Sequence, residues 1–237
     1  MVQSLHNRIA LVTGASRGIG RAVAKLFASE GAEVICVART QGALEELDDE
    51  ITATGGKCVL VPLDLTQDGS VERIAQAIAE RYGHLDILIG NAGTLGGELV
   101  PVGHGGAEFL GRIFSLNVTA NWRLINSLDP LLRRSESGRA VFVTDPIAHA
   151  HTPFWGAYAA SKVALEQLVM TWAAEIGTIT KIRANLISPC PVSTRLRAQA
   201  YPGEPRSLAR PPEQIAEQFL PLALLDCPFN GQIITVQ

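Results

Sequence analysis

Tyr158 and Lys162 lie four residues apart in the segment Tyr-Ala-Ala-Ser-Lys, where a long helical pattern begins. Side chains at this spacing project from the same face of a helix, one turn apart. A free tyrosine has a pKa of about 10 and is a poor base at neutral pH, but a nearby ammonium group favours the phenolate. The pair could therefore transfer a proton. A surface helix can carry the same two residues without any function, so the interpretation depends on the rest of the chain.

The composition is typical of one α/β domain that spans residues 1–237. Hydrophobic residues make up 47% of the chain and aromatic residues only 5%, so aliphatic side chains supply most of the apolar content. A parallel sheet that is covered by helices on both faces needs this kind of content. The length is sufficient to bury a large core.

Charge, cysteine spacing and the lengths of the apolar runs indicate which partners and which cellular environment to expect. The formal net charge is −3, and no basic run stands out, which argues against nucleic acid as a partner. The four cysteines show no CxxC pair, and reduced thiols are the expectation. The first residues, MVQSLHNR, contain no apolar leader segment, and no apolar run is long enough to span a membrane. We therefore expect a soluble, cytoplasmic protein that binds neither membranes nor nucleic acid.

Short apolar runs alternate with helical patterns along the whole chain. The strands are expected at 9–13, 33–38, 57–62, 85–90, 139–144, 182–187 and 231–236. The helices are expected to begin at about 19 and to cover 41–54, 68–82, 107–132, 157–176 and 212–225. This alternation predicts a doubly wound parallel sheet. Residues 93–107 and 189–212 show no periodicity and are expected to be irregular loops, the second one mobile.

A glycine-rich segment, TGASRGIG at 13–20, follows the first predicted strand and leads into the first helix. Glycines at this junction let the backbone approach a pyrophosphate, and the helix N-terminus supplies free N–H groups. The spacing of Gly14, Gly18 and Gly20 is GxxxGxG, which differs from the GxGxxG pattern. A plain tight turn is the alternative, and the position after the first strand favours a nucleotide site.

The end of the second strand indicates which nicotinamide cofactor is preferred. NAD sites place a carboxylate there, whereas the 2′-phosphate of NADP needs cations. Here Ala38 takes the acidic position, Arg39 follows it, and Arg17 lies in the glycine loop. We therefore expect NADP, with NAD as the alternative. Asp64, after the third strand, either contacts the adenine or caps a helix.

Five motifs occur together in the order and spacing of one family. They are TGASRGIG at 13–20, Asn91-Ala92-Gly93, Asn117, YAASK at 158–162, and Pro-x-x-Val-x-Thr at 189–194. Together they closely resemble the short-chain dehydrogenase/reductase family over nearly the whole chain. The resemblance implies a Rossmann fold with a seven-stranded, mainly parallel sheet. It also implies hydride transfer between a nicotinamide cofactor and a carbonyl/alcohol pair.

The resemblance also implies a role for each matching residue. Tyr158 would be the general acid/base, Lys162 would bind the ribose and lower the tyrosine pKa, and Asn117 would hold a water that links Lys162 to solvent. The segment 91–93 would flank the cofactor, and 187–194 would bracket the nicotinamide. The residues expected at the cofactor are Gly14, Ser16, Arg17, Gly18, Ile19, Gly20, Arg39, Asp64, Leu65, Asn91, Ala92, Gly93, Tyr158, Lys162, Pro189, Val192 and Thr194.

Two positions depart from the family pattern. The substrate-orienting serine of the family lies thirteen residues before the tyrosine, and here that position is Asp145. An ionised aspartate can only accept hydrogen bonds and repels a phenolate. Loss of such a donor elsewhere costs on the order of 10²–10³ in rate. Cys190 stands where the family has glycine, which predicts strain or crowding at the nicotinamide.

Three explanations of Asp145 remain open from the sequence. Asp145 could be protonated and donate like the serine. Thr144 could replace the serine, although strand alternation points it to the opposite face. The chain could instead bind the cofactor without ordinary turnover, as a sensor or scaffold. We expect an oxidoreductase, with Asp145 assigned to the catalytic group beside Tyr158, Lys162 and Asn117.

The surroundings of the predicted site allow further expectations. His149 and His151 have no third ligand at a convincing spacing, so no metal site is expected, although either ring could be an auxiliary proton donor. Phe154 and Trp155 line either the substrate pocket or a subunit contact. Residues 196–210 are a candidate lid. The family resemblance implies a homodimer or homotetramer through the helices at 107–132 and 157–176, and a small carbonyl or alcohol substrate.

Overall fold

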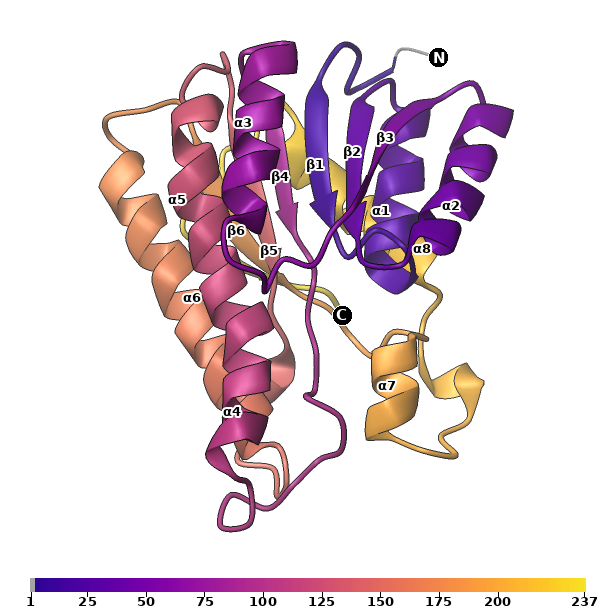
Figure 1. Cartoon of the computed structure of the whole chain (residues 1–237), viewed down its shortest axis with the longest axis vertical. Coiled ribbons are helices and arrows are strands. Elements are labelled where there is room, and N and C mark those ends of the chain that lie inside the picture. The colour runs from indigo at the N-terminus through magenta and orange to yellow at the C-terminus, as the bar shows by residue number, and fades with distance from the viewer. Residues whose placement is uncertain (1–2) are drawn as a thin grey trace.

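The computed structural model describes residues 3–237, except for the side chain of Arg206. One sheet of seven parallel strands has the order β3-β2-β1-β4-β5-β6-β7 (Figure 1). The strands are β1 (Ile9–Thr13), β2 (Glu33–Ala38), β3 (Lys57–Pro62), β4 (Ile87–Gly90), β5 (Arg139–Val143), β6 (Arg183–Ser188) and β7 (Ile233–Thr235). The predicted single-domain, doubly wound Rossmann architecture is confirmed, with strand bounds that differ from the prediction by one or two residues.

Helices cover both faces of the sheet (Figure 1). One face carries α1 (Gly18–Ser29), α2 (Gln41–Ala53), α8 (Pro212–Ala216) and α9 (Leu220–Ala223). The other carries α3 (Ser70–Tyr82), α5 (Ala120–Leu132) and α6 (Gly156–Ile176). Along β1, Ala10 and Val12 face the first group, and Ile9 and Leu11 face the second. Successive strand side chains point to opposite faces, which is why these strands are apolar throughout.

The helix that was predicted over 107–132 is not uniform. It consists of α4 (Ala107–Phe114), a π-helical turn at Ser115–Thr119, and α5. A π turn inserts an extra residue into the helix and is frequent at functional sites. Asn117 lies in this turn and is fully buried. The apolar spacing alone could not reveal the turn, because the helical pattern resumes after it.

The prediction that 189–212 is irregular is wrong. The segment contains α7 (Arg195–Ala200), a 3₁₀ turn at Arg206–Leu208, and a β-bridge between Val192 and Arg210. The hydroxyl of Thr194 caps α7 by accepting from the Arg197 N–H at 3.2 Å. A helix of six residues is too short to produce a recognisable apolar period.

The helix predicted over 212–225 is also interrupted. A 3₁₀ turn at Glu217–Phe219 separates α8 from α9. Pro221 has no N–H to continue the α-helical ladder, which is the physical reason for the break. Among the described residues, no helix combines the length and apolarity that crossing a bilayer requires.

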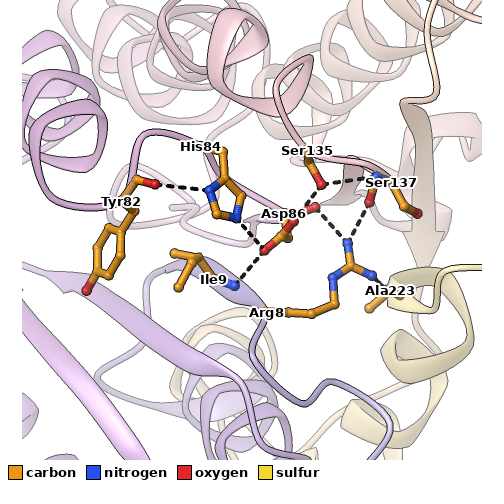
Figure 2. Close-up of polar contacts among 8 residues, drawn as sticks. All are labelled: Arg8, Ile9, Tyr82, His84, Asp86, Ser135, Ser137 and Ala223. Atoms are coloured by element: carbon orange, nitrogen blue, oxygen red, sulfur yellow. Dashed lines mark hydrogen bonds and ion pairs between the residues drawn. The ribbon is translucent and has the colours of Figure 1, made fainter.

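Asp86 forms hydrogen bonds at the amino edge of the sheet, which is the edge opposite to the cavity described below (Figure 2). One oxygen accepts from the Ile9 N–H at 2.9 Å, and the other accepts from the Ser135 hydroxyl at 2.5 Å. The His84 ring lies 3.3 Å from the first oxygen. The side chain of Asp86 therefore links the start of β1 to the start of β4 and to the loop before β5.

Arg8 completes this network (Figure 2). Its guanidinium donates to the carbonyl oxygens of Ala223 at 2.8 Å, Ser137 at 2.6 Å and Asp86 at 3.2 Å. These carbonyl groups belong to α9 and to loops at the amino edge of the sheet. One buried cation thus joins the beginning of the chain to its last helix.

We expect Asp86→Ala to lower the free energy of unfolding by about 2–3 kcal/mol, because the buried Ile9 N–H and Ser135 hydroxyl lose their acceptor. Urea denaturation measures the change. The matched control, Asp49→Ala at an exposed site of α2, should stay within about 0.5 kcal/mol of the parent protein. An equal loss in both variants would mean that the Asp86 network contributes nothing specific.

Candidate active site

A cavity of about 590 Å³ lies at the carboxyl ends of the strands. Its walls come from the ends of β1, β2, β4, β5 and β6, the start of α6, and α7. The sequence-predicted residues that line it are Gly14, Ser16, Arg17, Gly18, Ile19, Arg39, Asp64, Leu65, Asn91, Ala92, Gly93, Asp145, Tyr158, Lys162, Pro189, Val192 and Thr194. The carboxyl edge of an open parallel sheet is where such folds bind ligands.

The glycine loop needs its glycines for two different reasons. Gly14 and Gly18 have φ angles of +67° and +56°, which side chains rarely adopt. A Cβ atom on Gly20 would lie 2.4 Å from the carbonyl oxygen of Gly14, so the loop packs directly on α1. In the described structure, no side chain caps the N-terminus of α1 at Arg17. The loop and the free N–H groups of the helix fit the pyrophosphate of a dinucleotide.

Asn91 and Ala92 connect the ends of β1 and β4. Their N–H groups donate to the Thr13 hydroxyl oxygen at 3.0 and 3.1 Å, and the Asn91 amide donates to the Thr13 carbonyl at 2.9 Å. The Thr13 hydroxyl itself donates to the Ile89 carbonyl at 3.1 Å. These bonds hold the floor of the cavity rigid between the two strands.

Three arginines gather at one end of the cavity. Burial, followed by repulsion from Arg195 and Arg39, lowers the pKa of the Arg17 guanidinium. An anionic ligand at this place would relieve that repulsion. Arg39 is 69% exposed and lies 3.9 Å from the Asp64 carboxylate. The other oxygen of Asp64 accepts from the N–H and hydroxyl of Thr66, so Asp64 caps a turn and lines the cavity as well.

The end of β5 holds the buried face of α6. Val143 accepts from the Lys162 ammonium at 2.8 Å, and Asp145 accepts from the Tyr158 hydroxyl at 3.2 Å. Between them, the Thr144 hydroxyl donates to Glu166. Three consecutive residues therefore each bind one of three side chains that follow at four-residue intervals on α6.

The electrostatics of Tyr158 differ from the sequence prediction. Burial and the Asp145 carboxylate raise the pKa of Tyr158 well above its usual value, although the Lys162 ammonium lies 5.6 Å from the ring centre. Burial lowers the pKa of Lys162 to about 8, against the opposing effects of Asp145 and Glu166. The net lowering of the tyrosine pKa that was expected from the lysine is not found in this structure, because burial and the aspartate dominate.

Asp145 and Thr144 are distinguished by their contacts. The second oxygen of Asp145 accepts from the Ile147 N–H at 2.9 Å and caps the 3₁₀ turn at Pro146–His149. The Thr144 hydroxyl points to Glu166, as strand alternation predicted. Asp145 is therefore the residue of the two that contacts the Tyr158 hydroxyl, and the proposal that Thr144 replaces the serine does not fit the structure.

Two of the predicted site residues, Gly20 and Asn117, are not among the described residues that line the cavity. Gly20 packs under Gly14, as described above. The Asn117 amide donates to the Thr94 carbonyl and the Ser161 hydroxyl, both at 3.0 Å, and its oxygen accepts from the Thr94 N–H. The Asn117 carbonyl accepts from Asn121 at 2.9 Å. In this arrangement Asn117 joins the loop after β4 to α6.

The substrate side of the cavity is aromatic. Trp155 is buried, with its ring 5.7 Å from that of Tyr158 and 5.6 Å from that of Tyr201. Phe154 is 54% exposed, with a φ angle of +73°, so of these two aromatic residues Trp155 lines the cavity. Tyr201 was missed from the sequence, because α7 was not recognised.

The remaining polar candidates lie at the margin. His149 bonds to Glu166 at 2.7 Å, and His151 lines a separate surface groove, so neither ring belongs to the described lining of the main cavity. Cys190 lines the cavity, but it is not among the described residues with positive φ, so the expected backbone strain is wrong. Glu166 was also missed, although its four-residue spacing from Lys162 was a usable signal.

We expect Tyr158 to keep its proton to a higher pH than an ordinary tyrosine, because burial and Asp145 disfavour the phenolate. Asp145→Asn should lower the pKa of Tyr158, since it removes a negative charge at hydrogen-bond distance. Titration of ¹³Cζ-labelled tyrosine by NMR measures this, with Tyr158→Phe identifying the signal among the three tyrosines. The exposed Asp49→Asn is the control, and an unchanged Tyr158 titration in Asp145→Asn would contradict the assignment.

Comparison with known proteins agrees with this geometry. A family model described as short chain dehydrogenase matches residues 8–205. The oxidoreductase YciK of Escherichia coli (strain K12) is 34% identical over 220 residues, which are 91% of this chain and 86% of the relative. The structure of a short chain dehydrogenase from Pseudomonas syringae matches with a TM-score of 0.95 and 35% identity, over 100% of this chain and 97% of that chain.

A second solved structure carries a bound ligand. The short chain dehydrogenase from Shigella flexneri 2a str. 301, complexed with NADP, matches with a TM-score of 0.91 and 34% identity, over 98% of both chains. The family model covers most of this chain, which aligns with 86% of YciK and 97% of the Pseudomonas syringae protein. This chain therefore belongs to the short chain dehydrogenase family and is an NAD(P)-dependent oxidoreductase.

Proposed function

We propose that the protein interconverts a carbonyl and an alcohol with NADP(H), with Tyr158 as the general acid/base. The observation that carries this proposal is the Tyr158 hydroxyl at the cavity wall, one helical turn from the Lys162 ammonium. Both side chains are buried, so neither is an ordinary surface residue. A bound nicotinamide supplies or accepts the hydride in such a reaction.

The residues that would hold NADP fit the parts of that molecule. The glycine loop and the N-terminus of α1 suit the pyrophosphate, and Lys162 is able to donate to the ribose hydroxyls. Arg17 and Arg39 would bind the 2′-phosphate, since Ala38 offers no carboxylate that would repel it. The mutual repulsion of the arginines supports NADP over NAD, because the extra phosphate is the better counter-charge.

The protonation state of Tyr158 favours carbonyl reduction. A tyrosine with a raised pKa keeps its proton at neutral pH and can give it to the oxygen of the substrate. The Lys162 ammonium, 5.6 Å from the centre of the Tyr158 ring, would stabilise the phenolate that results. Asp145 holds the Tyr158 hydroxyl but, when ionised, donates nothing to the substrate oxygen. We therefore infer that turnover is slower than with a serine at this position.

The cavity indicates an apolar substrate. Trp155, Tyr201 and Leu196 are among the residues that line it. The Arg197 guanidinium beside them makes two bonds of 2.6 Å to the Glu204 carboxylate and is therefore occupied. A neutral, largely apolar ketone or aldehyde suits these walls better than a carboxylated one.

Arg39→Ala should weaken NADPH binding by roughly 10–100-fold, which corresponds to the loss of one charge-assisted bond. NADH binding should change less than about threefold, since NADH has no 2′-phosphate. Isothermal titration calorimetry measures both affinities. Arg73→Ala, an exposed arginine on α3, is the matched control. Equal weakening of both cofactors by Arg39→Ala would contradict the assignment of the 2′-phosphate.

Tyr158→Phe should reduce turnover on a panel of apolar ketones by on the order of 10²–10⁴, because it removes the proton donor. Asp145→Ser should raise turnover at least about tenfold by adding a donor to the substrate oxygen. NADPH consumption measures both.

The competing function, a cofactor-dependent sensor or scaffold, is favoured by the presence of an aspartate at position 145. Tight NADPH binding with no turnover on any ketone, unchanged in Tyr158→Phe, would support it.

We also propose that the protein is a homodimer or homotetramer. Large apolar side chains are exposed on the helices that the family resemblance implicated, namely Leu110 on α4, Trp122 on α5, and Val163 and Met170 on α6. A second copy of the chain would bury them. Light scattering that gives a 25.3 kDa particle at assay concentrations would contradict this.

A further inference from the structure

Glu166 is a buried carboxylate for which the proposed reaction has no direct use. It lies on α6 one turn beyond Lys162 and is 4% exposed. An ionised group at such a depth is costly unless it is paired and hydrogen-bonded. Its partners therefore indicate what it does.

Both oxygens of Glu166 are held by the segment that follows β5. One accepts from the Thr144 hydroxyl, and the other lies 2.7 Å from Nε2 of His149. The His149 side chain is 67% exposed, so the pair reaches from solvent to the interior of the site. Glu166 itself is not among the residues that line the cavity, although its partner Thr144 is.

Glu166 shares its surroundings with the Lys162 ammonium. Thr144, which binds Glu166, is adjacent in the chain to Val143, which accepts from Lys162 at 2.8 Å. The charged groups that act on this ammonium in the described residues are Glu166 and Asp145, and both favour its charged form. Asp145 is also bonded to Tyr158, so Glu166 is the carboxylate that acts on the lysine without contacting the tyrosine.

We propose that Glu166 is a positioning residue, whose buried carboxylate, held by Thr144 and His149, keeps the Lys162 ammonium charged and docked on the end of β5. Burial alone would drive this lysine toward its neutral form, which cannot stabilise a phenolate. Glu166 opposes that tendency from the next turn of the same face of α6, and it is not among the residues that line the cavity. The inference rests on the proposed roles of Tyr158 and Lys162.

The titration of Lys162 tests the proposal without any substrate. The protein has four lysines, so the ¹³Cε lysine NMR spectrum is simple, and Lys162→Arg identifies the signal. Lys162 should titrate near pH 8 in the parent protein. Glu166→Gln, which keeps the shape of the side chain, should lower its pKa by about one unit. Glu166→Asp, which keeps the negative charge, should lower the pKa of Lys162 less than Glu166→Gln does.

The matched control is Glu175→Gln, the same chemical change at an exposed position of α6. It should leave the Lys162 titration unchanged. If Glu166→Gln does not fold, Thr144→Val removes only the hydroxyl that holds Glu166 and should shift Lys162 in the same direction by a smaller amount. A Lys162 titration that is unchanged in the folded variants would overturn the proposal.

A kinetic measurement separates this inference from the proposed function. The pH dependence of turnover in Glu166→Gln should move by the same amount and in the same direction as the Lys162 titration. A merely structural role would lower the rate at every pH without moving the profile. If Tyr158→Phe retained turnover, the proposed function would fail, whereas the lysine titration would still decide the role of Glu166.

Discussion

The docking of α6 on the end of β5 is the contact on which the site depends. A backbone carbonyl, a hydroxyl and a carboxylate from three consecutive residues bind Lys162, Glu166 and Tyr158. A strand end and a helix face match here because the helix repeats its inner face about every four residues. The contact fixes the orientation of the Tyr158 and Lys162 side chains, and for the proton transfer proposed above this would reduce the reorganisation that the reaction requires.

Burial and charge oppose each other within this contact. Removing Lys162 from water favours its neutral form, and two carboxylates favour its charged form. Burial and Asp145 together keep the proton on Tyr158. A cluster of this kind is sensitive to each member, since deleting one charge leaves another buried without its counterpart. The Asp145 carboxylate therefore favours the protonated form of Tyr158, whose hydroxyl it contacts.

The two edges of the sheet are built for different purposes. At the amino edge, Arg8 and Asp86 form hydrogen bonds to backbone groups of several segments (Figure 2). At the carboxyl edge, glycines replace side chains, the N-terminus of α1 is left uncapped by any described side chain, and a cavity remains.

The amino-acid sequence by itself determined the alternation of strands and helices and the glycine loop. It also singled out Tyr158, Lys162 and Asp145 as candidate site residues. These features depend on local periodicity and on motif spacing, which a linear chain records directly. The tertiary structure alone decided the π turn at Asn117, the helix α7 with Tyr201, and the pairing of Glu166 with Thr144 and His149. It also decided the direction of the Tyr158 pKa, because burial and contacts between distant segments exist only after the chain has folded.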